Sequence, residues 1–361
     1  MPKVMLTGGG TGGHIYPCLA LVPALERRGM TVIYGGGEGD TPERRLAELR
    51  GLPFFGVPCV AFKRQLTPAA LKNNLGIPSR LREGVKRAKD ILSAERPDAV
   101  FSKGGYAALP FVLAAKKLGI PVVSHESDST LGLSNRIAKL TGARVLTAFP
   151  GCKAGEFVGM PVREELFRRD PEEARRAFSL SPDARVLLIT GGSSGAASLN
   201  AAVKKALPLL TERFAVIHLT GKNKGEGLPP RSERYIPLAY ADDMGALYAA
   251  SDVVVSRAGA TAVAEISALG KRAVFVPLPK GASRGDQIPN AALAEKYGAI
   301  VLPDDRRLPV LLPAAVERAL RGAPMRHIAS DTGGKIADIL DATIRRGVIC
   351  KDKKPSPNGS Q

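Results

Sequence analysis

The residues best suited to chemistry lie in a glycine-rich turn near the N-terminus, Gly8-Gly9-Gly10-Thr11-Gly12-Gly13-His14. An apolar strand precedes the turn, and the pattern after it predicts a helix over Leu19–Arg28. Glycines let backbone amides approach an anion closely, and the positive end of a helix dipole strengthens the attraction. A phosphate or diphosphate is therefore the expected ligand. The same helix end disfavours an imidazolium, so we expect a neutral His14 that can accept a proton.

Two other interpretations of this turn stay open. Its spacing also satisfies the G-x-G-x-x-G pattern of dinucleotide-dependent dehydrogenases. That pattern normally comes with an acidic residue at the end of the second strand, where this chain has Val32-Ile33-Tyr34-Gly35-Gly36-Gly37. The second interpretation is a tight turn that binds nothing, which needs fewer glycines than are present. Hydride chemistry is thus disfavoured, and phosphate binding is the leading hypothesis.

Three polar turns in the second half of the chain suggest related chemistry. Gly191–Gly195 follows an apolar strand and repeats the anion-binding pattern. In Ser256–Glu265 a strand ends, small residues turn the chain and a helix begins, so a diphosphate can bind at the helix start. The Glu265 carboxylate can accept hydrogen bonds from two vicinal hydroxyls, as on a ribose. In Ser283–Ala291, the Gln287 amide can contact sugar hydroxyls. Each also has a purely structural explanation, as a helix cap or a favourable charge at a helix start.

Strands that alternate with amphipathic helices must position these turns. The expected strands are Val4–Thr7, Thr31–Tyr34, Ala99–Ser102, Pro121–Ser124, Arg144–Leu146, Val186–Thr190, Val216–Thr220, Tyr235–Leu238, Val253–Ser256 and Ala273–Val276. This alternation predicts parallel sheets with helices on both faces. The strand, glycine turn and helix recur about 180 residues apart, so we predict two Rossmann-like, doubly wound domains joined at Arg163–Pro182. Such sheets bind ligands at the carboxyl ends of their strands, which predicts a site in an interdomain cleft.

The charge of the chain favours anionic ligands. Lys and Arg outnumber Asp and Glu by 52 to 34, a net charge of +18, in a chain of 361 residues. Phosphorylated substrates, nucleic acid or an anionic membrane face would all suit this charge, and a generally basic surface is the plain alternative. The chain has no Trp, so aromatic platforms for single-stranded nucleic acid are scarce and we expect no nucleic-acid partner.

Membrane contact, if it occurs, is expected to be peripheral. No apolar stretch approaches the roughly 20 residues that span a bilayer, and no signal peptide precedes the first strand. A basic stretch over residues 63–91 is interleaved with leucines, which is typical of a membrane-surface contact, or equally of a helix whose apolar face packs on its own domain. The four cysteines are widely spaced, which suits a reducing cytosol.

Taken together, these motifs resemble the MurG family. The resemblance covers nearly the whole chain and rests on nine segments in the same order: GGGTGGHIYP, KGGYAALP (103 to 110), HESD with GLSNR (125 to 136), AFPG (148 to 151), GMPVR (159 to 163), GGSSGAASLN (191 to 200), ADDM (241 to 244), AGATAVAE (258 to 265) and GDQIPNA (285 to 291). It implies a GT-B fold with an N-terminal acceptor domain over residues 1–162 and a C-terminal donor domain over 163–333. A last helix, 334–350, would cross back to the first domain, ahead of a disordered tail over 351–361.

The family resemblance also implies an activity. It is the transfer of N-acetylglucosamine from UDP-GlcNAc to the 4-hydroxyl of the MurNAc-pentapeptide of lipid I, with inversion, to form lipid II. This step belongs to peptidoglycan synthesis, and hence to cell-wall biogenesis, cell shape and division. The expected location is the cytoplasmic face of the cell membrane, with the anionic lipid surface and other cell-wall enzymes as candidate partners. No D-x-D, HExxH or Cys/His cluster is present, so we expect neither a metal nor a cofactor.

Site residues follow from the resemblance position by position. Thr11, Gly12 and Gly13 would border the donor and acceptor phosphates. The UDP-sugar site would be lined by Asp128, Arg163, Ser193, Ala241, Ala260, Thr261, Ala262, Val263, Ala264, Glu265 and Gln287. Ala241 would act through its backbone near uracil, Glu265 would hold the ribose and Gln287 the sugar. His14 is the first candidate for the general base and Asp128 the second.

Two positions depart from the family pattern. Many members have Asn where this chain has Asp128, and the extra carboxylate would alter the sugar contacts or offer another base. The donor motif often has Thr where this chain has Ala262, which removes one hydroxyl contact. Three rival functions stay open: a GT-B transferase with another lipid or aglycone acceptor, a UDP-sugar 2-epimerase, and a non-catalytic nucleotide-sugar or nucleic-acid binder.

Overall fold

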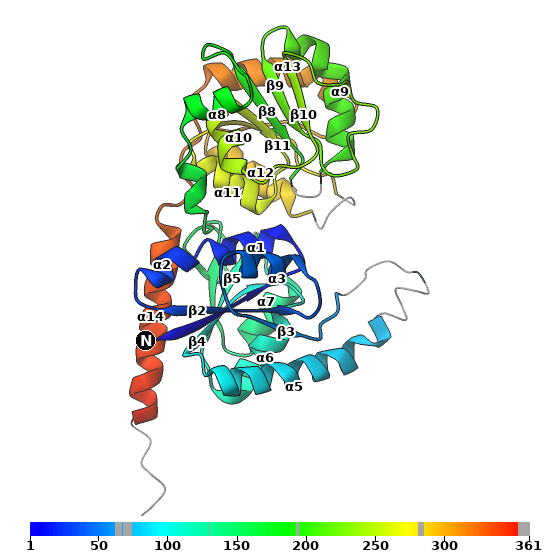
Figure 1. The fold of residues 1–361 in the computed structure, drawn as a ribbon. Helices are drawn as coiled ribbons and strands as arrows, with labels where there is room; N and C mark the ends of the chain where they lie inside the picture. Colours follow the sequence, from blue (N-terminus) through cyan, green and yellow to red (C-terminus); the bar gives the residue numbers. More distant parts are fainter. Residues whose placement is uncertain (62–66, 68–73, 129, 193–194, 281–284, 353–361) are drawn as a thin grey trace, which may run out of the picture. The chain divides into compact units, whose positions relative to one another are not determined.

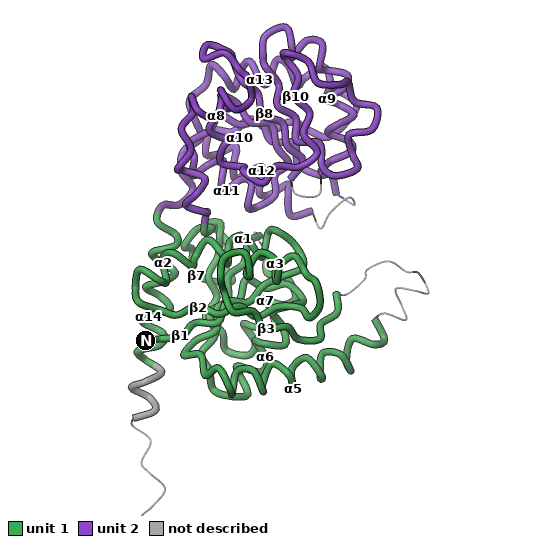
Figure 2. The backbone as a smooth tube through the Cα atoms, viewed as in Figure 1, with its two compact units in different colours: residues 1–161, 331–361 green, residues 162–330 purple. Residues whose placement is uncertain are grey.

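The chain folds into two compact units, each built on one parallel sheet (Figure 1). A computed structural model describes residues 1–61, 67, 74–128, 130–192, 195–280 and 285–352. Unit 1 comprises Met1–Pro161 and Asp331–Gln361, and unit 2 comprises Val162–Ser330 (Figure 2). The two parallel α/β sheets confirm the predicted fold class. Most of the expected tail, residues 353–361, lies outside the described residues.

Unit 1 contains a seven-stranded sheet in the order β3-β2-β1-β4-β5-β6-β7. Its strands are β1 (Lys3–Gly8), β2 (Thr31–Gly37), β3 (Phe54–Val57), β4 (Ala99–Gly104), β5 (Val122–Glu126), β6 (Arg144–Thr147) and β7 (Glu156–Phe157). All neighbours pair in parallel. The chain adds strands outward from β1 on one side, then restarts at β4 on the other. Open α/β sheets bind ligands where the strand order reverses in this way.

Helices cover both faces of this sheet: α1 (Gly12–Leu19), α2 (Val22–Glu26), α3 (Pro42–Leu49), α5 (Ile77–Glu95), α6 (Leu109–Leu118), α7 (Leu133–Leu140) and α14 (Thr332–Asp352). Alternate residues of β1 enter different cores, because successive side chains of a strand point to opposite faces. Val4 and Leu6 pack with α1, α2 and α14, whereas Met5 packs with α5 and α6. The two faces of unit 1 are thus closed by different helices.

The last helix, α14, belongs to unit 1 although it follows unit 2 in the sequence (Figure 2). Ile336, Leu340 and Ile344 are buried in the core shared with α1 and α2. The Nε of Arg28 donates to Asp338 at 2.8 Å, and the Thr332 hydroxyl donates to the carbonyl of Val158 at 3.2 Å. The helix therefore completes one face of the first sheet.

Unit 2 contains a six-stranded parallel sheet in the order β10-β9-β8-β11-β12-β13. Its strands are β8 (Val186–Thr190), β9 (Ala215–Leu219), β10 (Tyr235–Leu238), β11 (Val253–Ser256), β12 (Arg272–Phe275) and β13 (Ile300–Val301). Its helices are α8 (Pro171–Ala177), α9 (Ala197–Thr211), α10 (Met244–Ala250), α11 (Ala260–Ala268), α12 (Gln287–Lys296) and α13 (Leu308–Arg321), with a 3-10 turn at Glu164–Phe167. Here the strand order reverses between β8 and β11.

Two details of the expected elements were wrong or missing. The predicted helix Leu19–Arg28 is instead two helices, α1 and α2, and α1 begins at Gly12 inside the glycine turn. Pro23 has no amide to donate to the Leu19 carbonyl, which weakens the helical hydrogen bonding where α1 ends and α2 begins. The strands β3, β7 and β13 were not predicted. β7 and β13 have two residues each, and β3 is interrupted by Gly56, so none shows a clear hydrophobic period.

A buried histidine network braces the sheet of unit 2. The Nδ2 of Asn200 donates to the carbonyls of Thr220 and Lys224, both at 3.0 Å, so its Oδ1 faces His218 and accepts from Nε2 at 3.1 Å. The Nδ1 of His218 then accepts from the Tyr235 hydroxyl at 3.0 Å. Burial lowers the pKa of His218 from 6.5 to about 4, which keeps the imidazole neutral. This network fixes the backbone after β9.

We expect acid to destabilise the protein through His218. The unfolded chain binds a proton near pH 6.5 and the folded one only near pH 4. The free energy of unfolding should therefore fall by up to about 1.4 kcal/mol per pH unit between these values. Urea unfolding followed by circular dichroism at several pH values measures this slope. His218→Gln should flatten it, whereas replacing the exposed His327 by Gln should not; equal slopes in all three proteins would contradict the assignment.

Candidate functional site

The first glycine turn lies at the point where the strand order of unit 1 reverses. It follows β1, and the neighbouring β4 ends in Lys103 and Gly104 at the same edge of the sheet. Thr11 is the N-cap of α1, so Gly12 and Gly13 form the first helical positions, whose amides have no intrahelical acceptor. The sequence thus folds into the strand, turn and helix start that an anion site requires.

His14 lies in the first turn of α1, close to two neighbouring segments. Its Nδ1 is 3.0 Å from the hydroxyl of Thr11. A Cβ added to Gly105, on the loop after β4, would lie 3.5 Å from the same ring nitrogen. If Nδ1 carries the proton and donates to Thr11, then Nε2 is the nitrogen that can accept one. The arrangement suits a general base that is oriented by a hydroxyl.

Two glycines of the turn are required by the protein itself. A Cβ on Gly9 would lie 2.3 Å from the buried carboxylate of Glu43, and one on Gly10 would lie 2.5 Å from the ring of Tyr106. The Gly10 amide donates to Glu43 at 3.3 Å, and the Gly37 amide donates to its other oxygen at 3.3 Å. The amide of Gly10 is therefore engaged, and the amides at the start of α1 are better placed to bind an anion.

The second catalytic candidate, Asp128, follows β5, so β4 lies between it and the strand that precedes His14. The Asp128 amide donates to the carboxylate of Glu126 at 3.0 Å. The other oxygen of Glu126 accepts from the Gly132 amide at 2.8 Å and from Nδ2 of Asn135 at 2.9 Å. Glu126 thus fixes the loop that carries Asp128. Both catalytic candidates lie at the carboxyl edge of one sheet.

In unit 2, the corresponding reversal brings the second glycine turn beside the start of α11. The turn follows β8, and α11 follows the adjacent β11. A Cβ on Gly195, whose φ is +65°, would lie 2.6 Å from the carbonyl of Thr220, so only glycine fits there. Gly259 is the N-cap of α11, and a Cβ there would meet nothing within 4 Å among the described residues. The positive end of this helix is open to a ligand.

The predicted ribose carboxylate, Glu265, lies within a small polar network. Its Oε1 accepts from the Arg163 guanidinium at 3.1 Å, and its Oε2 accepts from the Tyr248 hydroxyl at 3.3 Å. Burial raises the pKa of Glu265, and Arg163 opposes that rise. A carboxylate offers about four acceptor positions, so two remain for vicinal hydroxyls. The structure therefore joins two predicted donor-site residues, Arg163 and Glu265, in one ion pair.

The remaining donor-site predictions divide into four groups. Thr261 and Ala262 are half-buried at the start of α11, and Ala241 is half-buried before α10. Ala260, Val263 and Ala264 are buried, and Val263 is 0 % exposed, so the structure presents no surface of Val263 to a ligand. Ser193 lies outside the described residues. Gln287 begins α12, and its Oε1 accepts from the Leu278 amide at 3.0 Å, which leaves its NH₂ group for a sugar hydroxyl.

Sequence reasoning missed several buried polar residues around these turns. Arg257 is 4 % exposed, pairs with Asp304 at 2.8 Å and donates to the carbonyl of Val276 at 3.0 Å. It ties the loop after β11 to the segment after β12. A charged residue directly after an apolar strand is a visible signal for Arg257, but nothing in the sequence identifies its distant partner.

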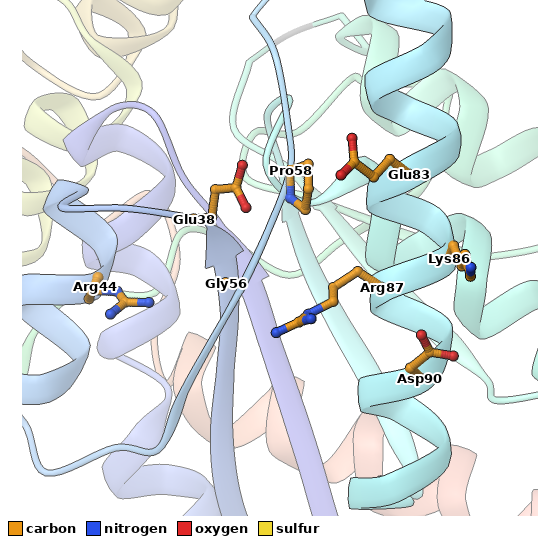
Figure 3. Close-up of a pocket in the computed structure, with 8 residues that line it drawn as sticks. All are labelled: Glu38, Arg44, Gly56, Pro58, Glu83, Lys86, Arg87 and Asp90. Atoms are coloured by element: carbon orange, nitrogen blue, oxygen red, sulfur yellow. The ribbon is translucent and has the colours of Figure 1, made fainter.

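A polar groove in unit 1 is separate from the predicted site residues (Figure 3). It has a volume of about 470 Å³ and is lined by Glu38, Arg44, Gly56, Pro58, Glu83, Lys86, Arg87 and Asp90. The last four of these residues lie on one face of α5. From that face Arg87 extends toward Gly56 (Figure 3). Three carboxylates balance three cations, so the groove has no net attraction for the expected anionic substrates.

The basic segment 63–91 is only partly described. Lys63, Arg64 and Lys72 lie outside the described residues. On α5, Val85, Ala88 and Leu92 pack into the core of unit 1, while Arg80, Arg82 and Lys89 are exposed. The apolar face of α5 therefore covers its own domain. Among the described helices none has the length and apolar character to cross a bilayer, and the described side chains form no metal-binding group of three His, Cys, Asp or Glu.

Comparisons with family models match both halves of the chain. Residues 4–147 match the glycosyltransferase family 28 N-terminal domain, and residues 186–335 match the C-terminal domain of the same family. Among solved structures, MurG of Acinetobacter baumannii superposes with a TM-score of 0.66 at 25 % identity, covering 98 % of this chain and 100 % of that one. The calicheamicin glycosyltransferase CalG4 gives 0.63 at 19 % identity, which supports the fold alone.

Two relatives illustrate the similarity in sequence. A protein of Streptomyces avermitilis is 41 % identical over 358 residues, which is 93 % of this chain and 96 % of that protein. One from Lachnoclostridium phytofermentans is 40 % identical over 306 residues, 82 % of this chain and 84 % of that protein. Both are named UDP-N-acetylglucosamine--N-acetylmuramyl-(pentapeptide) pyrophosphoryl-undecaprenol N-acetylglucosamine transferase.

The ion pair between Arg163 and Glu265 should contribute to the stability of the protein. Arg163→Met should lower the free energy of unfolding by about 3 kcal/mol, because the buried Glu265 carboxylate loses its countercharge. Adding Glu265→Gln should recover part of that loss, since an amide needs no countercharge. Urea unfolding of the two variants measures the difference. If the double variant is no more stable than Arg163→Met, the two side chains are not coupled as the structure indicates.

Proposed function

Because the chain belongs to glycosyltransferase family 28 and, within it, to the MurG family, we propose that it transfers N-acetylglucosamine from UDP-GlcNAc to lipid I, forming lipid II. The enzyme is then an undecaprenyldiphospho-muramoylpentapeptide β-N-acetylglucosaminyltransferase of peptidoglycan synthesis. One observation carries this conclusion: a relative with that named activity matches 93 % of the chain at 41 % identity. A likeness of fold alone would not distinguish lipid I from other acceptors.

The donor assignment to unit 2 is supported by three neighbouring groups. The open start of α11 offers amides and a helix dipole to a diphosphate. Glu265 keeps acceptor positions for the ribose hydroxyls while Arg163 and Tyr248 hold it in place. Gln287 lies at the start of α12 with its carbonyl oxygen already bound to Leu278. These groups would bind the nucleotide and stabilise the charge that grows on the leaving UDP.

The acceptor chemistry is proposed for unit 1. The 4-hydroxyl of N-acetylmuramic acid would attack the anomeric carbon with inversion, while a base takes its proton. His14 is the first candidate, because it lies beside the start of α1 and its Nδ1 can donate to Thr11. Asp128 at the end of β5 is the second. The backbone amides of Thr11, Gly12 and Gly13 would border the substrate phosphates.

We further propose that the enzyme works as a peripheral protein at the cytoplasmic face of the cell membrane. Its acceptor carries an undecaprenyl chain, which resides in the bilayer. The excess of basic residues and the exposed cations of α5 would favour an anionic lipid surface. Other cell-wall enzymes are proposed as partners because the family resemblance implies them.

The decisive experiment supplies radiolabelled UDP-GlcNAc with and without a lipid I analogue and identifies the products. Label transferred to the analogue, with UDP released only in its presence, supports the proposal. Formation of an epimeric UDP-sugar without acceptor would support the 2-epimerase alternative. Transfer to another lipid or aglycone in preference to lipid I would indicate a different acceptor, and binding without any turnover would indicate a non-catalytic protein.

His14→Ala should abolish turnover, by at least about a hundredfold in kcat, which is the usual contribution of a general base. UDP affinity should stay nearly the same, because the side chain proposed to bind the ribose, Glu265, belongs to unit 2. Steady-state kinetics and calorimetric titration with UDP measure the two effects. Near-normal turnover would remove His14 from this role and favour Asp128.

Glu265→Ala should weaken UDP binding itself, since both ribose hydroxyls lose their acceptor. We expect an increase in Kd of at least about tenfold, the effect of one or two hydrogen bonds to a charged group. Tyr248→Phe, which removes only a hydrogen bond to Glu265, serves as the matched control and should change Kd less. Unchanged donor affinity in Glu265→Ala would contradict the ribose assignment.

A further inference from the structure

A buried carboxylate beside the first glycine turn has no part in the mechanism proposed so far. Glu43 is 1 % exposed and lies in the first turn of α3, where the positive end of the helix favours a negative charge. Its Oε2 accepts from the Gly10 amide at 3.3 Å, and its Oε1 accepts from the Gly37 amide at 3.3 Å. One side chain thus joins the turn after β1 to the end of β2.

Glu43 is bound by amides rather than by a cation. Within the described parts of the chain, no lysine, arginine or histidine forms an ion pair with it. The neighbouring Tyr34, Cys59 and Tyr106 are neutral, because burial raises the pKa of all three, that of Cys59 to about 12. A buried carboxylate without a countercharge is costly unless hydrogen bonds satisfy it. The two amide contacts therefore keep this charge in the interior.

Glu43 and a second group from β2 fix the peptides of the turn. The Tyr34 hydroxyl donates to the carbonyl of Gly8 at 2.7 Å. Glu43 binds the amide of Gly10, whose φ of +84° is one that glycine adopts readily. A Cβ on Gly9 would lie 2.3 Å from Oε1 of Glu43, so the carboxylate occupies the space that a side chain would need. The turn is thus held on both sides of Gly9.

The orientation of Gly10 determines where α1 begins. Thr11 alone separates Gly10 from Gly12, the first helical position. The Thr11 carbonyl accepts from the amides of His14 at 3.0 Å and Ile15 at 3.2 Å. A rotation at Gly10 would therefore move the groups that the proposed mechanism uses, which are the amides at the helix start and the His14 ring.

We propose that Glu43 is a positioning residue for the transfer reaction: it holds the first glycine turn so that the start of α1 presents its amides and His14 to the substrates. This inference rests on the proposed transferase function. It adds a residue with almost no surface for a substrate to contact. The alternative is that Glu43 only stabilises the fold of unit 1.

Glu43→Gln tests the role with little change in shape, since one of the two acceptor oxygens becomes a donor and only one amide can stay bound. In the full-length enzyme, kcat with a lipid I analogue should fall at least about tenfold, because small displacements of reacting groups are costly. Glu48→Gln, at an exposed position of the same helix, is the matched control and should leave kcat unchanged. A wild-type kcat in Glu43→Gln overturns the proposal.

Amide hydrogen exchange separates a positioning role from a purely structural one. In Glu43→Gln, peptides that cover residues 8–15 should exchange at least about tenfold faster, the effect of losing a hydrogen bond to a charged group. Peptides from α6, which packs on the other face of the sheet, should exchange at the wild-type rate. Equal acceleration in both regions would indicate general destabilisation of unit 1 and would overturn the proposal.

Glu43→Asp separates the contacts from the charge. The shorter side chain keeps the carboxylate, but both contacts are already 3.3 Å long, so it cannot reach both amides. The same loss of kcat and the same local exchange are expected, and they decide the question if Glu43→Gln does not fold. Wild-type kcat and exchange in Glu43→Asp would show that the charge alone suffices, and would overturn the proposal.

The exchange measurement requires no turnover, so its outcome is separable from that of the proposed function. If the wild-type protein transfers no sugar to lipid I, the transferase assignment fails. Faster exchange confined to residues 8–15 in the Glu43 variants would still support Glu43 as the residue that holds the turn. Unchanged exchange there would overturn the inference whether or not the protein is a transferase.

Discussion

Each unit depends on one constraint. Parallel strands end at the same edge of a sheet, and at one point of that edge the connections after two adjacent strands run to opposite sides. In unit 1 this point lies between β1 and β4, and in unit 2 it lies between β8 and β11. Amides at helix starts and polar side chains that follow neighbouring strands therefore lie close together at this point. The motifs of both halves follow these strands, which is why segments far apart in the sequence come together at one candidate site in each unit.

The buried charges at these edges set the conditions under which a site can form. In unit 1, Glu43 accepts from the Gly10 amide, and the buried Lys103 contacts His125 and Ser127. In unit 2, Arg163 pairs with Glu265, and Arg257 pairs with Asp304. Each buried charge has an opposite charge or several hydrogen-bond partners, so the loops that carry the candidate catalytic groups are held before any substrate arrives.

The sequence predicted the fold class, most strands and the position of each glycine turn, because apolar runs and glycines are local signals. It failed where a residue's role is decided by a distant partner. The need for glycine at Gly9 and Gly10 comes from Glu43 and Tyr106, more than 30 residues away. The start of α1 was misplaced because glycine disfavours the interior of a helix, whereas here packing of the apolar face of α1 overrides that preference.

The return of α14 to unit 1 has a consequence for biosynthesis. Ribosomes make the chain from the N-terminus, so unit 2 emerges in full before Ile336, Leu340 and Ile344 can close the face formed by α1 and α2. Until then this apolar surface stays open to water or to a chaperone. Unit 1 is therefore the first unit to be translated in part and the last whose core can be completed.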